Sequence, residues 1–88
     1  MFKYTANTLK KIEDLLQEAG YIVRYEKGNF TAGYCILESR KVIVINRYYE
    51  TEARINSLFE IMGKLQIEET LLSEGSREFL NELHLVRA

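Results

Sequence analysis

The stretch Lys41-Val42-Ile43-Val44-Ile45-Asn46 decides the fold of this 88-residue chain. Its consecutive β-branched residues favour a strand over a helix. Side chains alternate across a pleated strand, so the two valines point to one face and the two isoleucines to the other. Both faces of this strand are therefore apolar. We expect helices to cover one face, and either the C-terminal helix or a second copy of the chain to cover the other.

Two further strands are expected upstream of this one. Residues 21–26 and 31–37 are rich in β-branched and aromatic side chains. The triplets Lys27-Gly28-Asn29 and Glu38-Ser39-Arg40 separate the three apolar runs, and both have the composition of turns. The sequence therefore predicts a three-stranded antiparallel meander.

Apolar residues at helical spacing precede and follow the strands. The first set lies between candidate N-caps at residues 5–8 and Gly20, which stands where a helix commonly ends in the left-handed conformation. The second set follows Thr51, a candidate N-cap, and continues through residues 71–72, until Gly75-Ser76 interrupts it and Ser76 caps a short terminal helix. The periodic residues are Leu9, Ile12, Leu15, Leu16 and Ala19, then Ile55, Leu58, Phe59, Met62 and Leu65, then Phe79, Leu80, Leu83 and Val86. Of these, Leu58, Phe59 and Met62 are assigned to the contact between the second helix and the sheet.

These segments predict one domain of the α+β class over residues 1–88, because a chain of this length is too short for a second hydrophobic core. The predicted element order is α-β-β-β-α-α. Helices are expected to pack on one face of the antiparallel meander.

Charge and composition narrow the class of protein. Twelve Lys and Arg residues against 13 Asp and Glu leave a formal charge of −1, which argues against a strongly basic nucleic-acid arm. The apolar runs are far shorter than the roughly 20 residues of a membrane helix, and the N-terminus lacks the apolar segment of a secretory signal. A single cysteine excludes an internal disulfide. We therefore expect a cytoplasmic protein with no membrane partner.

Few residues offer catalytic chemistry. Cys35 has apolar neighbours in its strand, so its thiol is predicted to be buried and inert. His84 is the one histidine, and with Glu78 and Glu82 as its nearest acids it makes a poor set of metal ligands. The local signatures of phosphate-binding loops, redox cysteine pairs and serine hydrolases are absent. No catalytic, cofactor-binding or metal-ligating residue is predicted.

Basic side chains and tyrosines are interleaved along the predicted strands, a mixture that single-stranded nucleic-acid surfaces use. Glu26, Glu38 and Glu50 lie in the same segment and offset much of the positive charge. A nucleic-acid-binding accessory domain is therefore an alternative and not the leading hypothesis. The basic residues are Arg24, Lys27, Arg40, Lys41 and Arg47, and the tyrosines are Tyr21, Tyr25, Tyr34, Tyr48 and Tyr49.

One pattern of residues resembles a known family. Gly33-Tyr34-Cys35-Ile36 is followed by the strand that ends in Ile45-Asn46, then by an acidic connection, and then by Arg54 leading into a helix. This order is similar to that of the small zinc metallopeptidases of the ImmA/IrrE type. Less specifically, the chain resembles small bacterial α+β proteins to which no activity is assigned.

The resemblance implies a helix that carries H-E-x-x-H, in which two histidines hold zinc and the glutamate acts as general base. Here the aligned residues are Phe59-Glu60-Ile61-Met62-Gly63, so the glutamate is present and both histidines are absent. The resemblance thus implies a degenerate relative that has kept the scaffold and lost the reaction.

The leading functional expectation is a non-catalytic protein-protein interaction module, homodimeric or bound to another protein. A former metallopeptidase of the zincin type is the first alternative, and the nucleic-acid-binding domain is the second. The surface is expected where helices leave the sheet uncovered, because large exposed apolar patches are rare on monomers. The residues assigned to it are Tyr21, Val23, Tyr25, Tyr34, Val42, Val44, Tyr48 and Tyr49.

Overall fold

A computed structural model describes residues 3–28, 33–37 and 40–87 of the chain. Its helices and strands follow one another in the expected order of helix, three strands and two helices, with a short 3-10 turn added before the last helix. The elements are α1 (Ala6–Glu18), β1 (Tyr21–Glu26), β2 (Gly33–Leu37), β3 (Arg40–Asn46), α2 (Thr51–Met62), the 3-10 turn η1 (Glu69–Leu71) and α3 (Glu74–Arg87).

The sheet is mixed, and the predicted antiparallel meander is wrong. Its strand order is β1-β3-β2, so β3 lies between the other two. β1 pairs with β3 in parallel, and β2 pairs with β3 antiparallel. β3 was expected to need a cover on both faces, but the helices pack against the face that carries Ile43 and Ile45, and Val42 and Val44 lie on the other face. Alternation along a strand sets which residues share a face, but it does not set which strands are neighbours.

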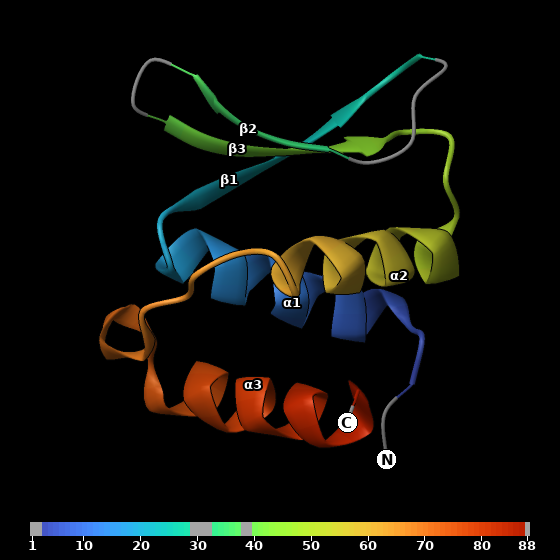
Figure 1. Cartoon of the computed structure of the whole chain (residues 1–88). Coiled ribbons are helices and arrows are strands. Elements are labelled where there is room, and N and C mark those ends of the chain that lie inside the picture. The colour runs from blue at the N-terminus through green and yellow to red at the C-terminus, as the bar shows by residue number, and fades with distance from the viewer. Residues whose placement is uncertain (1–2, 29–32, 38–39, 88) are drawn as a thin grey trace.

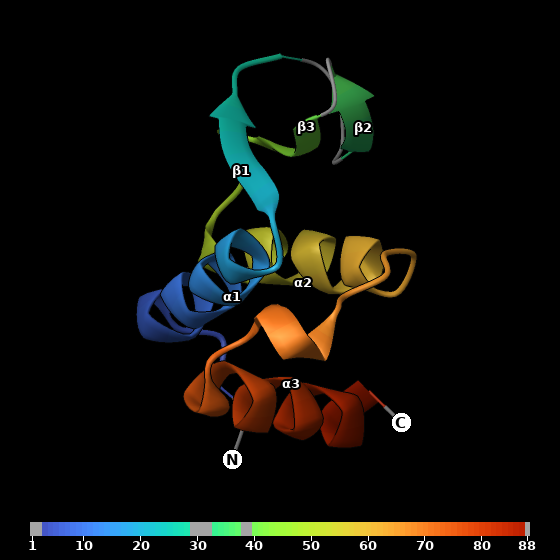
Figure 2. The same cartoon turned by 90° about the vertical axis from the view of Figure 1, so that its left-hand side faces the viewer.

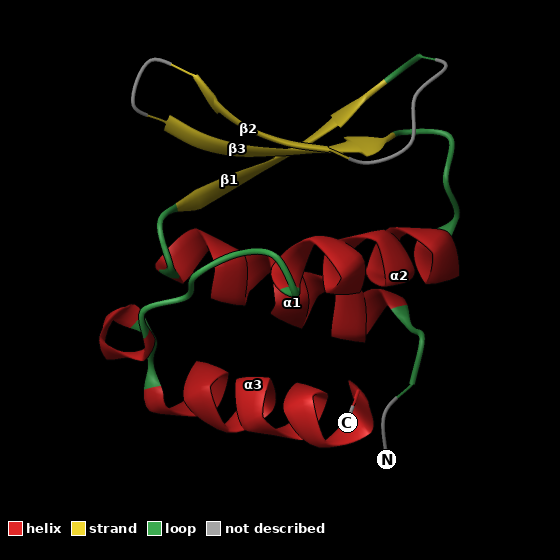
Figure 3. Cartoon of the chain, viewed as in Figure 1, coloured by secondary structure: helices red, strands yellow, loops and turns green. Residues whose placement is uncertain are grey.

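The helices form layers on one side of the sheet. Figure 1 shows α1 and α2 packed directly beneath the strands, with α3 as a further layer below them. The same arrangement coloured by secondary structure separates a strand layer from the helical layers (Figure 3). The hydrophobic core fills the space between these layers. Its buried members include Ile12, Leu15 and Leu16 of α1, Ile43 and Ile45 of β3, Ile55, Leu58 and Phe59 of α2, and Leu80 and Leu83 of α3.

The ends of α1 agree with the sequence prediction. The Thr5 side chain caps the helix by accepting a hydrogen bond from the backbone N–H of Thr8. Gly20, directly after the C-cap, has φ of +92°, a conformation that residues with a Cβ rarely adopt. This glycine turns the chain at once from α1 into β1.

The apolar pattern of the second predicted helix is interrupted in the structure. α2 begins at Thr51, so that Glu50 occupies the N-cap position, and it ends at Met62 instead of running on to residues 71–72. Gly63, a poor helix former, stands at its C-cap. Leu72 is nevertheless buried, because the segment after α2 turns back over the core. Helical spacing therefore continued by chance across a loop.

Candidate interaction surface

The face of the sheet that points away from the helices is called the outer face here. On β1, Ile22 and Arg24 lie on this face, and the strand register places Val42 and Val44 of β3 beside them. The Ile22 side chain is 42% exposed, Val44 is partly buried and Val42 is buried. Ile22 is therefore an exposed apolar side chain beside one partly buried and one buried valine on this face.

The structure places the residues that were expected to form one interaction surface on different sides of the sheet. Tyr21, Val23 and Tyr25 belong to the helix-facing side of β1, where Tyr21 is buried and the other two pack against the core. Val42 and Val44 lie on the outer face. The remaining members are Tyr49, which packs against the core, Tyr48, which is 70% exposed in the turn after β3, and Tyr34, whose side chain lies outside the described part of the structure.

β1 forms an edge of the sheet, as Figure 2 shows. Within the described residues, no strand pairs with its outward side. A groove of about 320 Å³ follows this edge on the side of α1. Glu13, Asp14 and Gln17 of α1 form one wall of the groove, and Tyr21, Ile22, Val23 and Tyr25 of β1 form the other. The groove therefore has two carboxylates on its helix side and apolar and tyrosine residues of β1 on the other.

Tyr25 links β1 to both neighbouring helices. Its hydroxyl donates a hydrogen bond to Oε2 of Glu13 on α1, and the guanidinium of Arg54 on α2 lies 4.5 Å from the centre of its ring. Burial, together with the Glu13 carboxylate, raises the pKa of the Tyr25 phenol above its usual value. The phenol is therefore a neutral structural group that fixes the position of the strand edge.

Arg54 and Asn46 hold the turn between β3 and α2. Arg54 donates from Nε to the carbonyl of Tyr49 over 2.8 Å and from Nη2 to the carbonyl of Arg47 over 2.9 Å. Buried Asn46 accepts from the Tyr48 backbone N–H at Oδ1 and donates from Nδ2 to the carbonyl of Gly28. Asn46 and Arg54 are both part of the family resemblance, and in this structure both stabilise the turn.

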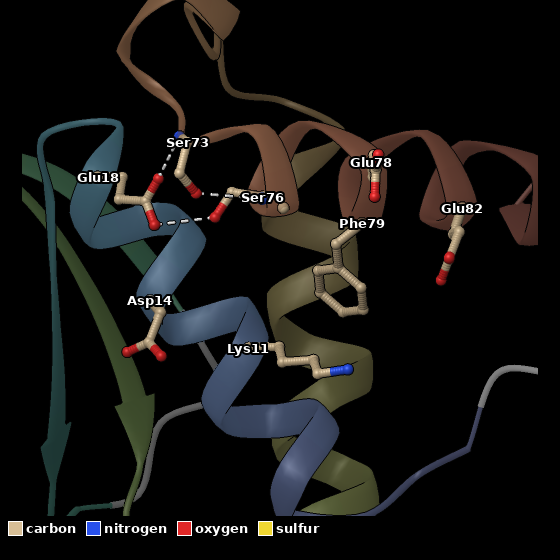
Figure 4. A pocket seen from close by; sticks show the side chains of 9 residues that line it. Lys11, Asp14, Glu18, Ser73, Ser76, Glu78, Phe79 and Glu82 are labelled. Atoms are coloured by element: carbon tan, nitrogen blue, oxygen red, sulfur yellow. Dashed lines mark hydrogen bonds between the residues drawn. The ribbon is translucent and has the colours of Figure 1, made fainter.

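A second concave region lies between α1 and α3 (Figure 4). It has a volume of about 400 Å³, and Lys11 lies 5.7 Å from the centre of the Phe79 ring at its wall. At one end Glu18 accepts hydrogen bonds from the Ser73 backbone N–H over 2.7 Å and from the Ser76 hydroxyl over 2.8 Å. The Ser73 N–H, followed by the Ser76 hydroxyl, lowers the pKa of the Glu18 carboxyl below its usual value. Glu18 therefore joins α1 to the start of α3.

The positions aligned with a zinc-binding helix lie in different surroundings. Phe59 is buried in the core, Glu60 is exposed, and Gly63 follows the last residue of α2. In the parts of the chain that the structure describes, no three Asp, Glu, His or Cys side chains are grouped so that they could hold a metal ion. The side chains of Cys35 and His84 lie outside these parts, and the predicted burial of the Cys35 thiol is not addressed by the structure.

Sequence reasoning missed three residues that shape the open side of the sheet and the helix junction: Ile22, Glu26 and Glu18. Ile22 was passed over because β1 carries apolar side chains on both faces, and the alternation alone does not show which face the helices cover. The pair formed by Arg24 and Glu26, 2.8 Å apart, is signalled by opposite charges two residues apart in a strand. Nothing in the local sequence signals that Glu18 meets Ser73, since 55 positions separate them.

Comparisons with known proteins yield no relative: no family model matches the chain, and neither a curated protein nor a solved structure matches it. Among the described residues, none of the helices has both the length and the apolar character required to cross a membrane.

Proposed function

We propose that this domain is a non-catalytic protein-binding module that acts in the cytoplasm as a homodimer, through the side of the sheet that the helices leave open. The observation that carries the proposal is the position of Ile22. Its side chain is 42% exposed on the outer face, beside Val42 and Val44, at the strand that forms a free edge. An exposed apolar side chain beside apolar neighbours, on a strand with an unpaired edge, suits a site of association between chains.

The strand-turn-helix segment supports ancestry from the zincin type of scaffold as a second candidate. Asn46 and Arg54, which the resemblance includes, make the hydrogen bonds that hold this turn. Phe59 fills the position of the first zinc ligand with an aromatic ring that belongs to the core. A chain that keeps the residues of the turn and replaces the histidines fits a scaffold retained for binding rather than for catalysis.

Light scattering of the purified chain over a wide range of concentration tests the homodimer. The mass is expected to move from the monomer to the dimer value as the concentration rises. Ile22→Asp should weaken this association, because it places a charge on the open side of the sheet. Leu71→Asp is the matched control, since Leu71 is also an exposed apolar residue, at 53%, but it lies in η1, away from the sheet.

The homodimer would be ruled out by a monomer mass at every concentration. If the Ile22 and Leu71 substitutions changed the dissociation constant equally, the interface would not lie on the open side of the sheet. Circular dichroism of each variant establishes that the fold is retained.

A further inference from the structure

The backbone of β1 shows which of its groups are free to bind another strand. The carbonyl of Glu26 accepts a hydrogen bond from the Arg47 N–H over 2.9 Å, so Glu26 directs its backbone groups toward β3. Successive residues of a strand direct these groups to opposite sides. The N–H and C=O groups of Val23 and Tyr25 therefore point away from β3, toward the side where the described chain has no further strand. An edge of this kind is a template for strand addition.

We propose that β1 of a second copy of this chain pairs antiparallel with this edge, about a two-fold axis at Tyr25. This inference rests on the proposed function and specifies its interface. In this register Arg24 of each copy lies directly opposite Glu26 of the other, on the outer face. The charges that already form a pair within one chain at 2.8 Å then form an alternating cluster of four charges across the axis.

Backbone geometry and charge together select this register. With Tyr25 opposite its own copy, the outward backbone groups of the two residues exchange both hydrogen bonds, and Arg24 and Glu26 fall at the positions where cross-strand side chains come closest. A register centred on Val23 would satisfy the backbone equally well. It would, however, place Arg24 opposite apolar Ile22 and leave Glu26 opposite Gly20. The charges therefore favour the axis at Tyr25.

The groove beside β1 supplies a second complementary contact. Residues 21, 23, 25 and 27 share the helix-facing side of the strand because side chains alternate. If the pairing continues by one residue, exposed Lys27 of the second copy lies opposite Val23, which lines the groove. The carboxylates of Glu13 and Asp14 form the helix wall of that groove. A lysine side chain thus enters an acidic groove on each side of the axis.

The fold leaves room for the second strand at the proposed axis. Figure 1 shows that β1 begins beside the end of α1 and runs away from the helices toward its last residue. Tyr25 is near that last residue, Glu26. In Figure 2 the outward side of β1 faces away from β3 and β2. The strand backbone at the axis is thus the part of β1 that lies farthest from the helical layers, while the Tyr25 side chain reaches back to Glu13 of α1 and Arg54 of α2.

Charge reversal tests the register. Arg24→Glu places carboxylates opposite each other on both sides of the axis, and Glu26→Arg does the same with guanidinium groups. Each variant alone is expected to raise the dimer dissociation constant by about tenfold, as two repulsive cross-strand pairs would. The double variant should restore the wild-type value. Arg77→Glu on α3, far from the sheet, is the control and should leave the value unchanged.

An equimolar mixture of the two single variants separates the cross-strand pairs from the pair within one chain. Each chain of the mixture still carries like charges at residues 24 and 26, but the two copies now attract each other at both positions. The mixture is therefore expected to form a heterodimer with an affinity near that of the wild type, measured by light scattering and by native mass spectrometry of chains that differ in mass.

Two results would overturn this inference. Single variants that dimerise as tightly as the wild type, or a mixture that associates no better than its components, would show that β1 does not pair in this register. If Ile22→Asp still weakens the wild-type dimer in that case, the proposed function stands and the interface is the outer face instead of the edge. A wild-type chain that remains monomeric at every concentration would end both proposals of self-association.

Discussion

The backbone N–H of Ser73 donates a hydrogen bond to Oε1 of Glu18 over 2.7 Å, and this bond joins the last residue of α1 to the residue that precedes α3. Ser73 in turn accepts the backbone N–H of Ser76 at its own Oγ. In a capping box, a glutamate three residues into the helix binds the N–H of the N-cap residue. Here Ser76 occupies that position, and a carboxylate from another helix takes the role.

The ionised form of Glu18 should therefore stabilise the fold. Because the pKa of Glu18 is lowered in the folded chain, its contribution is present at pH values above the usual pKa of a glutamate and is lost as the pH falls through the lowered value. Glu18→Gln is expected to lower the melting temperature at neutral pH and to reduce the loss of stability in acid. Thermal unfolding of both proteins as a function of pH measures this difference.

Asp14→Asn is the matched control for Glu18, since it removes the same charge from the same helix. The Asp14 carboxylate forms an ion pair with Lys10 over 3.5 Å, and exposed pairs of this kind contribute little to stability. If both substitutions change the acid limb of the stability curve equally, the link from Glu18 to α3 is not what stabilises the ionised form.

Phe59 should be among the residues most sensitive to truncation. Its side chain is 8% exposed and belongs to the core, as helical spacing predicted. Phe59→Ala is expected to destabilise the fold by about 3–5 kcal/mol, through lost burial and the cavity left behind. Glu60→Ala, at the exposed neighbouring position, should change the stability by no more than about 0.5 kcal/mol. Urea unfolding that gives similar midpoints for both variants would contradict this placement.

The sequence predicted where the helices and strands lie along the chain better than it predicted which strands pair. Strands and helices follow from local periodicity, and the end of α1 follows from Gly20, whose positive φ is a local requirement. The chain reverses direction between β1 and β2, as it would in a meander, but β2 pairs with the far side of β3 and leaves β1 next to β3, which local sequence does not specify. Local composition favoured the simplest meander, whereas burial of the most apolar strand placed β3 at the centre.

The candidate surface was predicted less well than the fold. Tyr21 and Val23 were assigned to an open surface together with Val42 and Val44, but the two sets lie on opposite faces of the sheet. Which face of β1 the helices cover depends on how α1 packs after the turn at Gly20, and this is a property of the tertiary structure. The alternation along β1 correctly separates its two faces, without identifying either of them as exposed.

Arg54 should resist conservative replacement. Its guanidinium donates to two carbonyls, those of Tyr49 and Arg47, while it lies over the ring of Tyr25. A lysine ammonium cannot reproduce this planar arrangement of donors. Arg54→Lys is therefore expected to cost roughly 1–3 kcal/mol, about the value of the lost hydrogen bonds. Arg47→Lys, a replacement at an exposed position, is the control for thermal unfolding, and an equal loss in both variants would assign no special role to Arg54.

Restoring the histidines of the zinc-binding motif should not restore a zinc site. Phe59→His would bury an imidazole in an apolar core, and Gly63→His would add a second imidazole one turn later, at the C-cap of α2. A catalytic zinc also needs a third ligand, and in the part of the chain that the structure describes no three Asp, Glu, His or Cys side chains already form a metal-binding group. The double variant is expected to be less stable than the wild type and to show no rise in melting temperature on addition of zinc. Stoichiometric zinc in the purified wild-type chain, with a loss of stability on chelation, would contradict this expectation and favour the metallopeptidase alternative.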